Sequence, residues 1–482
     1  MFGLLGRVAM VRPAIGMALI STVALLGAAP LRGQAGTDQA AERFLQQQRL
    51  ADEQLRRQRQ ELAPLESLLD VQWGGWIDYY LFHFDDGRQS SRLVHRPGFA
   101  FWTRATVDNN AHELFARVRL RYTHFRVGDE LDRQTDWWGP NFDQAWYGVD
   151  FARALHLAKP GDPWHLRARV GRQQVVFGTG YTLDMPLDAV LLDGRLLDMR
   201  VQGLFGKSIG SFPNIDRSEP VDSHSARLLY GVQVSYEGWR RHVPFVYALW
   251  NNDRTDERPP VWSQNFGYDS FYVGGGTRGA LARNLHYWAE AVFESGRSFA
   301  NRSFAQQDPI AAHGWDVGIE KLFDVATRPR LTLEYMFASG DGDRLFSPTN
   351  AVGGNRAGTK DTSFVGFGFR DTGIALAPTM SNLHVWRAGA ACLPLEKLAA
   401  FRELEIGTDW YLYYKHHRRA AISDPLADSF AGYVGWEMDY FINWRVATDV
   451  AWTIRWGTFF PGSAYSDDDS RHFLFTGVTW SF

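Results

Sequence analysis

The sequence contains a single cysteine, Cys392, among 482 residues. One cysteine excludes an internal disulfide framework, and we interpret it as a small lipid-facing residue in preference to a reactive thiol. Beyond the N-terminus, no segment approaches the roughly 20 apolar residues that a membrane-spanning helix needs. The formal net charge of −3 says nothing about a partner, and nucleic acid is not expected. Disulfide-stapled secreted domains and helical membrane proteins are therefore disfavoured.

Motifs that carry enzyme chemistry are also scarce. The sequence has no His-Glu-x-x-His pair and no phosphate-cradling loop, so neither an enzyme nor a cofactor or metal is expected. His416-His417 is interpreted as part of a solvated loop, with metal binding as the alternative. Asp341-Gly342-Asp343 hints at calcium but lacks the other ligands of an EF-hand.

Residues 1–35 have the three parts of a secretory signal peptide. These parts are the basic residues Arg7 and Arg12, an apolar run from Ala14 to Ala29, and the small residues Gly33 and Ala35 before a cleavage point at Gly36. A membrane anchor is the alternative, but the run is shorter than the roughly 20 residues that span a bilayer. Export with removal of residues 1–35 is therefore predicted.

Residues 36–70 differ from everything that follows. Gln, Glu, Arg and Leu dominate this segment, and its apolar residues have loosely helical spacing. We predict a periplasmic helix or flexible extension, with a short coiled coil as the alternative. Residues 71–482 are predicted to form a single domain.

The aromatic content sets the class of this domain. Aromatics make up 15% of the residues, including 19 Trp, and yet the mean hydropathy is −0.29. A transmembrane β-barrel explains both values because alternate residues face lipid or water and aromatics form belts at the interfaces. The last twelve residues alternate and end on Phe482, which is typical of a barrel-closing strand. The predicted belt residues include Trp410, Trp436, Trp452 and Trp480.

From Val71 onward the apolar pattern has a period of two. Between Leu114 and Tyr122 apolar residues alternate with arginines, which places the two kinds on opposite faces of a strand. We predict about eighteen strands, an even number, as expected when both barrel ends are periplasmic. They lie near 71–84, 98–108, 112–126, 142–152, 164–177, 186–192, 195–205, 225–237, 241–252, 269–280, 284–295, 312–323, 330–339, 380–392, 402–416, 429–441, 443–457 and 471–482.

Loop lengths separate a barrel from a soluble β-sandwich, since barrels alternate short periplasmic turns with long external loops. The predicted turns are Asn109-Asn110, Asp193-Gly194, Glu237-Gly238, Ala280–Arg283 and Asn443. The predicted external loops are 84–97, 127–141, 206–224, 253–268, 296–311 and 340–379. The last loop is expected to fold over or into the pore mouth. The 153–163 connection is a longer periplasmic exception.

Charges at the predicted inward positions separate by sign around the wall. The basic set is Arg117, Arg119, Arg121, His165, Arg167, Arg169 and Arg227. The acidic set is Glu290, Glu294, Glu334, Glu403, Glu405, Asp409, Glu437, Asp439 and Asp449, mixed with Arg445 and Arg455. Guanidinium groups in a channel concentrate anions and bind carboxylates bidentately, whereas cross-strand ion pairs that stiffen the wall are the alternative. Trp288 and Tyr411 are candidates for stacking on sugar rings.

Two segments resemble the alginate export porin family of bacterial outer-membrane barrels. The first is Gly171-Arg172-Gln173 with Phe177-Gly178-Thr179-Gly180 and Asp193-Gly194, and the second is Ala338-Ser339-Gly340-Asp341. The resemblance covers 71–482. It departs from the family pattern at Thr179 and Tyr181, where an Asp and an Arg are expected.

The resemblance implies an outer-membrane pore that is selective for a polyanionic uronate polymer through a basic constriction. The resemblance implies that the candidates for this constriction are Arg117, Arg119, Arg167 and Arg169 by position and Arg172 by motif. Strand alternation points Arg172 outward unless a bulge at Gly171 turns it.

The expected protein is an all-β transmembrane barrel in the outer membrane of a Gram-negative bacterium. It would pass a hydrophilic, anionic solute, with an alginate-like polysaccharide as the leading candidate. A general or small-anion porin is the alternative, followed by an outer-membrane hydrolase or a structural barrel. Expected partners are outer-membrane lipid, the sugar solute and periplasmic accessory proteins.

Overall fold

A computed structural model gives the fold. It describes residues 69–87, 91–128, 133, 135–157, 164–209, 226–254, 267–298, 300–301, 307–344, 348, 355–356 and 358–482. The predicted signal peptide (1–35) lies outside the described residues, as does the predicted extension (36–70) except for Leu69 and Asp70. Within the described ranges, no helix is long and apolar enough to cross a membrane.

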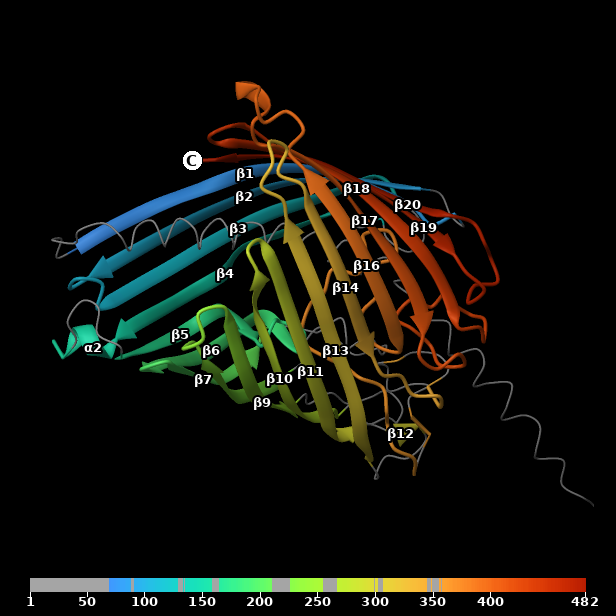
Figure 1. The fold of residues 1–482 in the computed structure, drawn as a ribbon, viewed down its shortest axis with the longest axis horizontal. Coiled ribbons are helices and arrows are strands. Elements are labelled where there is room, and N and C mark those ends of the chain that lie inside the picture. The colour runs from blue at the N-terminus through green and yellow to red at the C-terminus, as the bar shows by residue number, and fades with distance from the viewer. Residues whose placement is uncertain are drawn as a thin grey trace, which may run out of the picture. The chain divides into compact units, whose positions relative to one another are not determined.

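Eighteen antiparallel strands form one closed sheet, as the sequence predicts, and strands that follow one another in the chain lie side by side (Figure 1). Closure comes from β1, which pairs with both β2 and β20, so that Trp76 lies opposite Ser481 and Asp85 opposite His472. The strands of the barrel are β1 (Leu69–Asp85), β2 (Arg92–Val107), β3 (His112–Val127), β4 (Asp136–Asp150), β5 (Trp164–Phe177), β6 (Leu183–Leu196), β7 (Met199–Ser208), β8 (Arg227–Tyr236), β9 (His242–Asp253), β10 (Asp269–Ala282), β11 (Leu285–Ser298), β13 (Asp308–Leu322), β14 (Arg330–Ala338), β16 (Leu383–Cys392), β17 (Leu404–Lys415), β18 (Tyr433–Ala447), β19 (Val450–Pro461) and β20 (Arg471–Ser481).

The remaining elements are short. β12 (Ala300–Asn301) and β15 (Asn355–Arg356) form a separate parallel pair. α2 (Phe151–Ala154) is capped by the Asp150 side chain and begins the long 153–163 connection. The helix η1 (Ala399–Phe401) precedes β17.

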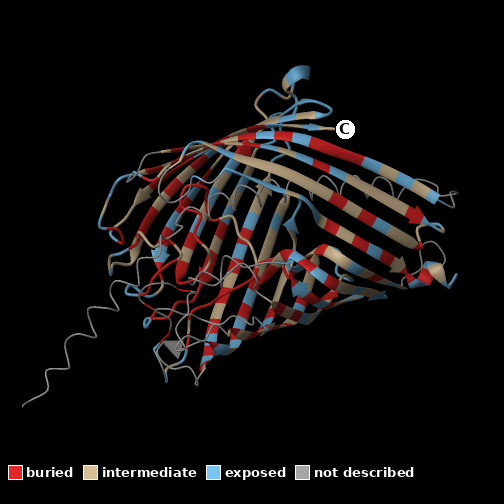
Figure 2. Ribbon diagram, turned by 180° about the vertical axis from the view of Figure 1, so that it is seen from behind, coloured by how far each residue is buried: buried red, intermediate tan, exposed pale blue. Residues whose placement is uncertain are grey.

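Burial alternates along the strands, as Figure 2 shows. In β1, Trp73 is 65% exposed and Ile77 45%, whereas Trp76 and Tyr80 are only 7% and 5% exposed. Large apolar side chains on the exposed face suit contact with lipid, so the buried face is the inner face of the barrel. The predicted belt residues Trp410, Trp436, Trp452 and Trp480 share the parity of exposed neighbours, as does Cys392.

The chain turns at Asn109-Asn110 as predicted, with φ of 51° and 63°. Two other predicted turns are wrong. Asp193-Gly194 lies inside β6, and the chain turns at Leu197, whose φ is +55°. Asn443 lies inside β18, which continues to Ala447. In both places the strand extends past a residue that is compatible with a turn, because the ladder hydrogen bonds outweigh local turn preference.

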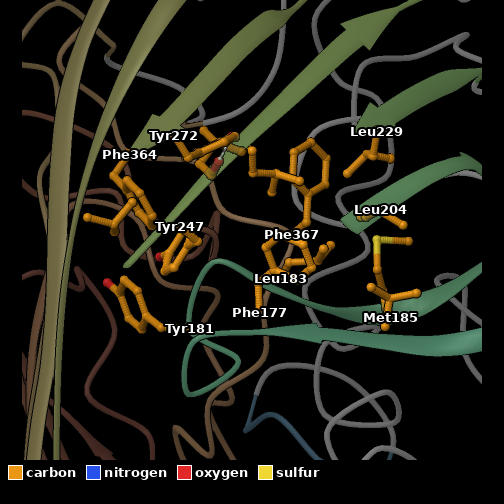
Figure 3. Packing of buried hydrophobic residues seen from close by; sticks show 14 of the residues in the cluster. Phe177, Tyr181, Leu183, Met185, Leu204, Leu229, Tyr247, Tyr272, Phe364 and Phe367 are labelled. Atoms are coloured by element: carbon orange, nitrogen blue, oxygen red, sulfur yellow. Dashed lines mark hydrogen bonds between the residues drawn. The ribbon is translucent and has the colours of Figure 1, made fainter. Parts of the chain in front are cut away.

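The connection between β14 and β16, residues 339–382, is called the inserted loop. Its described residues pack against the inner wall of the barrel, where the sequence predicts a loop folded over or into the pore mouth. Phe364, Val365 and Phe367 join a buried cluster with residues of β5, β6 and β8 to β11, part of which appears in Figure 3. Ile374 and Leu376 join a second cluster with residues of β1, β2 and β17 to β20. The inserted loop therefore contacts the inner wall on two sides of the lumen.

Candidate functional site

The arginines of β3 lie on its inner face. Phe115 and Arg117 are buried there, whereas Leu114 is exposed on the other face. Nε of Arg117 donates to both carboxylate oxygens of Asp143 at 2.9 and 3.0 Å, and Arg119 lies 3.6 Å from the same carboxylate. Asp143 reaches both because a register shift between β3 and β4 leaves it as an extra residue. The Arg121 guanidinium lies over the ring of Trp138, 5.3 Å from its centroid.

The inner face of β5 continues this basic surface. Arg167 lies 3.9 Å from Asp150, and Arg169 lies over the Trp146 ring at 5.3 Å. His165 has the same parity and lies opposite Arg195 of β6. β3 and β5, separated only by β4, together give a basic wall made of Arg117, Arg119, Arg121, His165, Arg167 and Arg169.

Arg172 does not belong to this wall, and its expected lumenal position is wrong. It shares a face with the exposed residues Leu166 and Val170, and it binds Asp188 bidentately at 2.8 and 3.1 Å on the outer face. Gly171 has a φ of +128°, but the alternation continues through it to the buried Gln173. The alternation along β5 therefore gives the correct face for Arg172, and the family motif does not.

Arg227 lies on the inner face of β8, but it is withdrawn from water. Its guanidinium lies 3.2 Å from Asp253, and both side chains are almost fully buried. Its backbone N–H donates to Ser208 Oγ at 3.0 Å. Arg227 begins β8 and Asp253 ends β9, so this ion pair links the ends of two neighbouring strands.

Two acidic residues of β11 bind loops. Glu290 accepts hydrogen bonds from Thr179 N and Thr179 Oγ1 at 2.5 and 2.6 Å, in the short loop between β5 and β6. Glu294 accepts one from the N–H of Val365 in the inserted loop at 2.9 Å. These carboxylates are buried and already engaged by donors.

On β18, Glu437 accepts three successive backbone N–H groups of the inserted loop. The donors are Ile374 and Ala375 to Oε1, both at 2.7 Å, and Leu376 to Oε2 at 2.9 Å. Asp439 accepts a further bond from the Ile374 N–H at 3.2 Å. The acidic side of the wall thus holds the segment that crosses the lumen.

Arg387 of β16 gathers three carboxylates. It lies 2.9 Å from Asp409, 3.3 Å from Glu334 and 3.2 Å from Asp371 of the inserted loop. Burial raises the pKa of Asp371, but the charges of Arg387 and Arg455 outweigh burial and lower it below its usual value. Asp371 therefore stays ionised as a loop-to-wall link.

Arg370 of the inserted loop binds β13 and the loop between β5 and β6. Its Nε donates to Asp316 of β13 at 2.6 Å, its other nitrogens donate to the carbonyl and hydroxyl of Thr179, and it stacks over Tyr181. Burial lowers its pKa, but Asp316 and the other nearby carboxylates outweigh burial and raise it. Trp288 also donates to Asp316, and Tyr411 is buried on the inner face beneath Arg387.

The remaining acidic candidates lie toward the periplasmic end. Glu405 binds Arg330 at 3.1 Å and Asn443 at 3.0 Å. Glu403 lies before β17 and pairs at 3.6 Å with Arg445. Asp449 lies in the exposed turn before β19, so its predicted place on the lumen wall is wrong. Its side chain leaves the wall because β18 is longer than the sequence suggests.

Sequence reasoning missed Arg92 and Arg96, which share the inner face of β2. Arg96 lies over the ring of Phe82 at 4.7 Å. The predicted strand begins at Gly98 because Pro97 lacks a backbone N–H, but β2 carries Pro97 on its exposed face and begins six residues earlier. Alternation on both sides of Pro97 was the available signal.

Neither metal-site candidate from the sequence gains support. The Asp341 carboxylate accepts the N–H groups of Asp343 and Thr362, both at 2.8 Å. The His416 ring accepts the Gly340 N–H at 3.1 Å. Over the described ranges, the one group of three side chains spaced for an ion is Asp467, Asp468 and Asp469, largely exposed in an external loop.

One Gly-x-Ser-x-Gly segment occurs, at Gly206–Gly210. Its Ser208 ends β7, is buried, and accepts the Arg227 N–H. A hydrolase elbow instead exposes its serine at a strand-to-helix turn. Ser208 therefore has a structural role in the barrel wall, where it links β7 to β8.

A family model described as alginate export matches residues 140–478. The chain belongs to the alginate export family. The solved structure of OccK8 (OprE) from Pseudomonas aeruginosa is similar in fold, with a TM-score of 0.54 and 9% identity over 86% of this chain and 98% of that chain. OprD from the same organism gives a TM-score of 0.50 and 11% identity over 86% and 94%. No curated protein matches the chain.

Family and fold place this alginate export family member in the outer membrane of a Gram-negative bacterium, as a porin channel. The family match includes Arg167, Arg169 and the inserted loop. It begins after β3, so Arg117, Arg119 and Arg121 lie outside the matched range.

Proposed function

We propose that this porin passes a hydrophilic anionic solute, an alginate-like polysaccharide, along the basic wall and past the inserted loop. One observation carries the proposal: the two signs of inner charge have different surroundings. Glu290, Glu294 and Glu437 are buried and accept loop N–H groups, whereas Arg119 and Arg167 keep part of their side chains exposed. Anions passing the loop would therefore meet guanidinium groups.

Passage would be passive. Guanidinium groups along a water-filled path raise the local concentration of anions and can bind each carboxylate through two donors. Successive groups along β3 and β5 let an anionic unit leave one arginine as it meets the next. Binding at several weak sites permits conduction, because no single site holds the solute tightly.

The test is single-channel recording of the refolded protein in planar bilayers. The variant Arg119→Ala/Arg167→Ala/Arg169→Ala removes basic-wall charge, and Arg172→Ala is the matched control because it removes an arginine from the outer face of the same strand. We expect anion selectivity and block by oligouronates in the wild type and in Arg172→Ala, and loss of both in the triple variant. Equal selectivity in all three proteins would reject the proposal.

A small-anion porin is the second candidate, favoured by the inserted loop itself. Because this loop packs on two sides of the lumen, it reduces the cross-section open to a polymer. Block by monouronates that does not strengthen with chain length would favour the small-anion porin. Block that strengthens with length would favour the polysaccharide.

A further inference from the structure

The acidic residues of the inner wall have a role that the family match does not assign. We propose that Glu437 is a positioning residue that holds the inserted loop across the lumen, and that the loop leaves this position when the carboxylate is lost. Glu294 of β11 supports the same loop through the N–H of Val365. The inference deepens the proposed function, because the anchored loop sets the passage along which the basic wall acts.

The Glu437 carboxylate is buried and surrounded by hydrogen-bond donors. Its side chain is 0% exposed. Besides the three loop N–H groups, the hydroxyl of Tyr413 donates to Oε2 at 3.1 Å. Tyr413 shares its one hydroxyl proton with the Thr372 carbonyl, so the three loop N–H groups are the main donors to the carboxylate. No shorter acidic or amide side chain at this position reproduces that set.

The loop has matching geometry. Gly373, with a φ of +93°, turns the chain so that the next three N–H groups converge on one point. A Cβ at Gly373 would lie 2.5 Å from Oε1 of Glu437, so a larger residue does not fit. Successive N–H groups that converge in this way form an anion-binding nest. Here the anion is a side chain of the wall.

The other contacts of the loop tip depend on this anchor. The Thr372 carbonyl accepts the Tyr413 hydroxyl at 2.8 Å, and Asp371 lies next in the chain, at Arg387. Beyond them, Arg370 reaches Asp316 on β13, a strand separated from that of Arg387 only by β14. Release at Ile374–Leu376 therefore removes the support beneath both charged residues of the tip.

The basic and acidic sets of inner-wall residues thus have different roles. The acidic set acts on the loop, and the basic set acts on the solute. Neutralising Glu437 should then change how wide and how steady the channel is, while its preference for anions persists.

Glu437→Gln is the decisive variant because it keeps the shape but replaces one acceptor oxygen with a donor amide that faces the loop N–H groups. The matched control is Glu320→Gln, an inner-face carboxylate on β13 that pairs with Arg330. Heat-modifiable migration in detergent gels verifies that each barrel folds. We expect Glu437→Gln to show higher unitary conductance with switching between levels, and faster amide exchange over residues 372–377. Glu320→Gln should match the wild type.

A reversible disulfide distinguishes release of the loop from other effects of the Glu437→Gln substitution. The Cβ that Gly457 lacks would lie 2.6 Å from Cγ1 of Ile374, which brings the two β-carbons within disulfide range. It would also lie 2.5 Å from Oδ1 of Asp439, so the Asp439 carboxylate must turn aside in this variant. In a Cys392→Ser background, Ile374→Cys/Gly457→Cys should restore wild-type conductance to Glu437→Gln when oxidised and lose it when reduced. Wild-type conductance and exchange in folded Glu437→Gln would overturn the proposal, as would failure of the formed disulfide to restore conductance. The anion-to-cation permeability ratio in the same recordings tests the proposed function separately.

Discussion

Nε of Arg370 in the inserted loop donates to Oδ2 of Asp316 on β13 across 2.6 Å, and the carboxylate is fully buried. Removing one member of such a pair leaves a charge without compensation in a poorly solvated place. Because the two residues lie on different elements, their pairing reports directly on where the loop sits.

Arg370→Met should therefore lower the free energy of unfolding by about 3–5 kcal/mol, the usual cost of stranding a buried charge. Arg370→Met/Asp316→Asn should recover much of that loss, since the stranded carboxylate is gone. Urea unfolding in lipid vesicles measures both. Equal losses in the single and double variants would mean that the charge of Asp316 is not what the guanidinium compensates.

Leu197 occupies the left-handed region in the turn between β6 and β7, and its side chain is 64% exposed. Leu197→Gly should raise the stability by up to about 1 kcal/mol, because it removes backbone strain and sacrifices little burial. Leu196→Gly is the matched control, since Leu196 is equally exposed but lies in β6 and should lose stability. Thermal unfolding in detergent micelles compares them, and destabilisation of both variants would contradict the turn geometry.

Gly171 has no room for a side chain. Its φ is +128°, and an added Cβ would lie 2.2 Å from the carbonyl oxygen of Ala145. Gly171→Ala should cost at least about 1–3 kcal/mol, the range for a residue held in an unfavourable backbone region. Gly194→Ala on the neighbouring strand meets no atom closer than 3.6 Å and should be nearly neutral. Similar unfolding midpoints for the two variants would refute this assignment.

The fold was predictable because the wall of a barrel repeats one physical rule. Every strand has a lipid face and an inner face, so the period of two recurs through the chain and locates all eighteen strands. Strand ends were less predictable. Pro97 suggested a late start for β2, and Asp193-Gly194 suggested a turn, but ladder pairing carried both strands through these residues.

Parity also predicted which face most charged residues take, and it was more reliable at Arg172 than the family motif was. It did not reveal what those residues bind. Contacts such as Glu437 with Ile374 or Arg370 with Asp316 join residues 54 or more positions apart through an irregular loop. No periodic pattern specifies where such a loop returns to the wall.

The base of the inserted loop is bound by a histidine that follows β17 and titrates in the acid range. The His416 ring accepts the Gly340 N–H through Nδ1 at 3.1 Å, which requires an unprotonated nitrogen. Burial, followed by the nearby rings of His417, His384 and His313, lowers the pKa of His416 to about 4. Because the folded pKa lies below the ordinary value of about 6.5, this contact stabilises the protein above pH 6.5, and its contribution is lost as the pH falls toward 4.

His416→Asn keeps an acceptor for Gly340 but does not titrate, so the stability advantage of the wild type over this variant should shrink as the pH falls from 6.5 to 4. His417→Asn tests the cause of the low pKa, because His417 bonds to Asn382 through its backbone while its ring is one of those that lower the pKa of His416. Thermal unfolding at closely spaced pH values gives the three profiles. If the wild type and His416→Asn run parallel across this window while both remain folded, protonation of His416 does not loosen the loop. A difference that closes between pH 6.5 and 4 for His416→Asn, and closes less for His417→Asn, would assign the acid sensitivity to this one hydrogen bond.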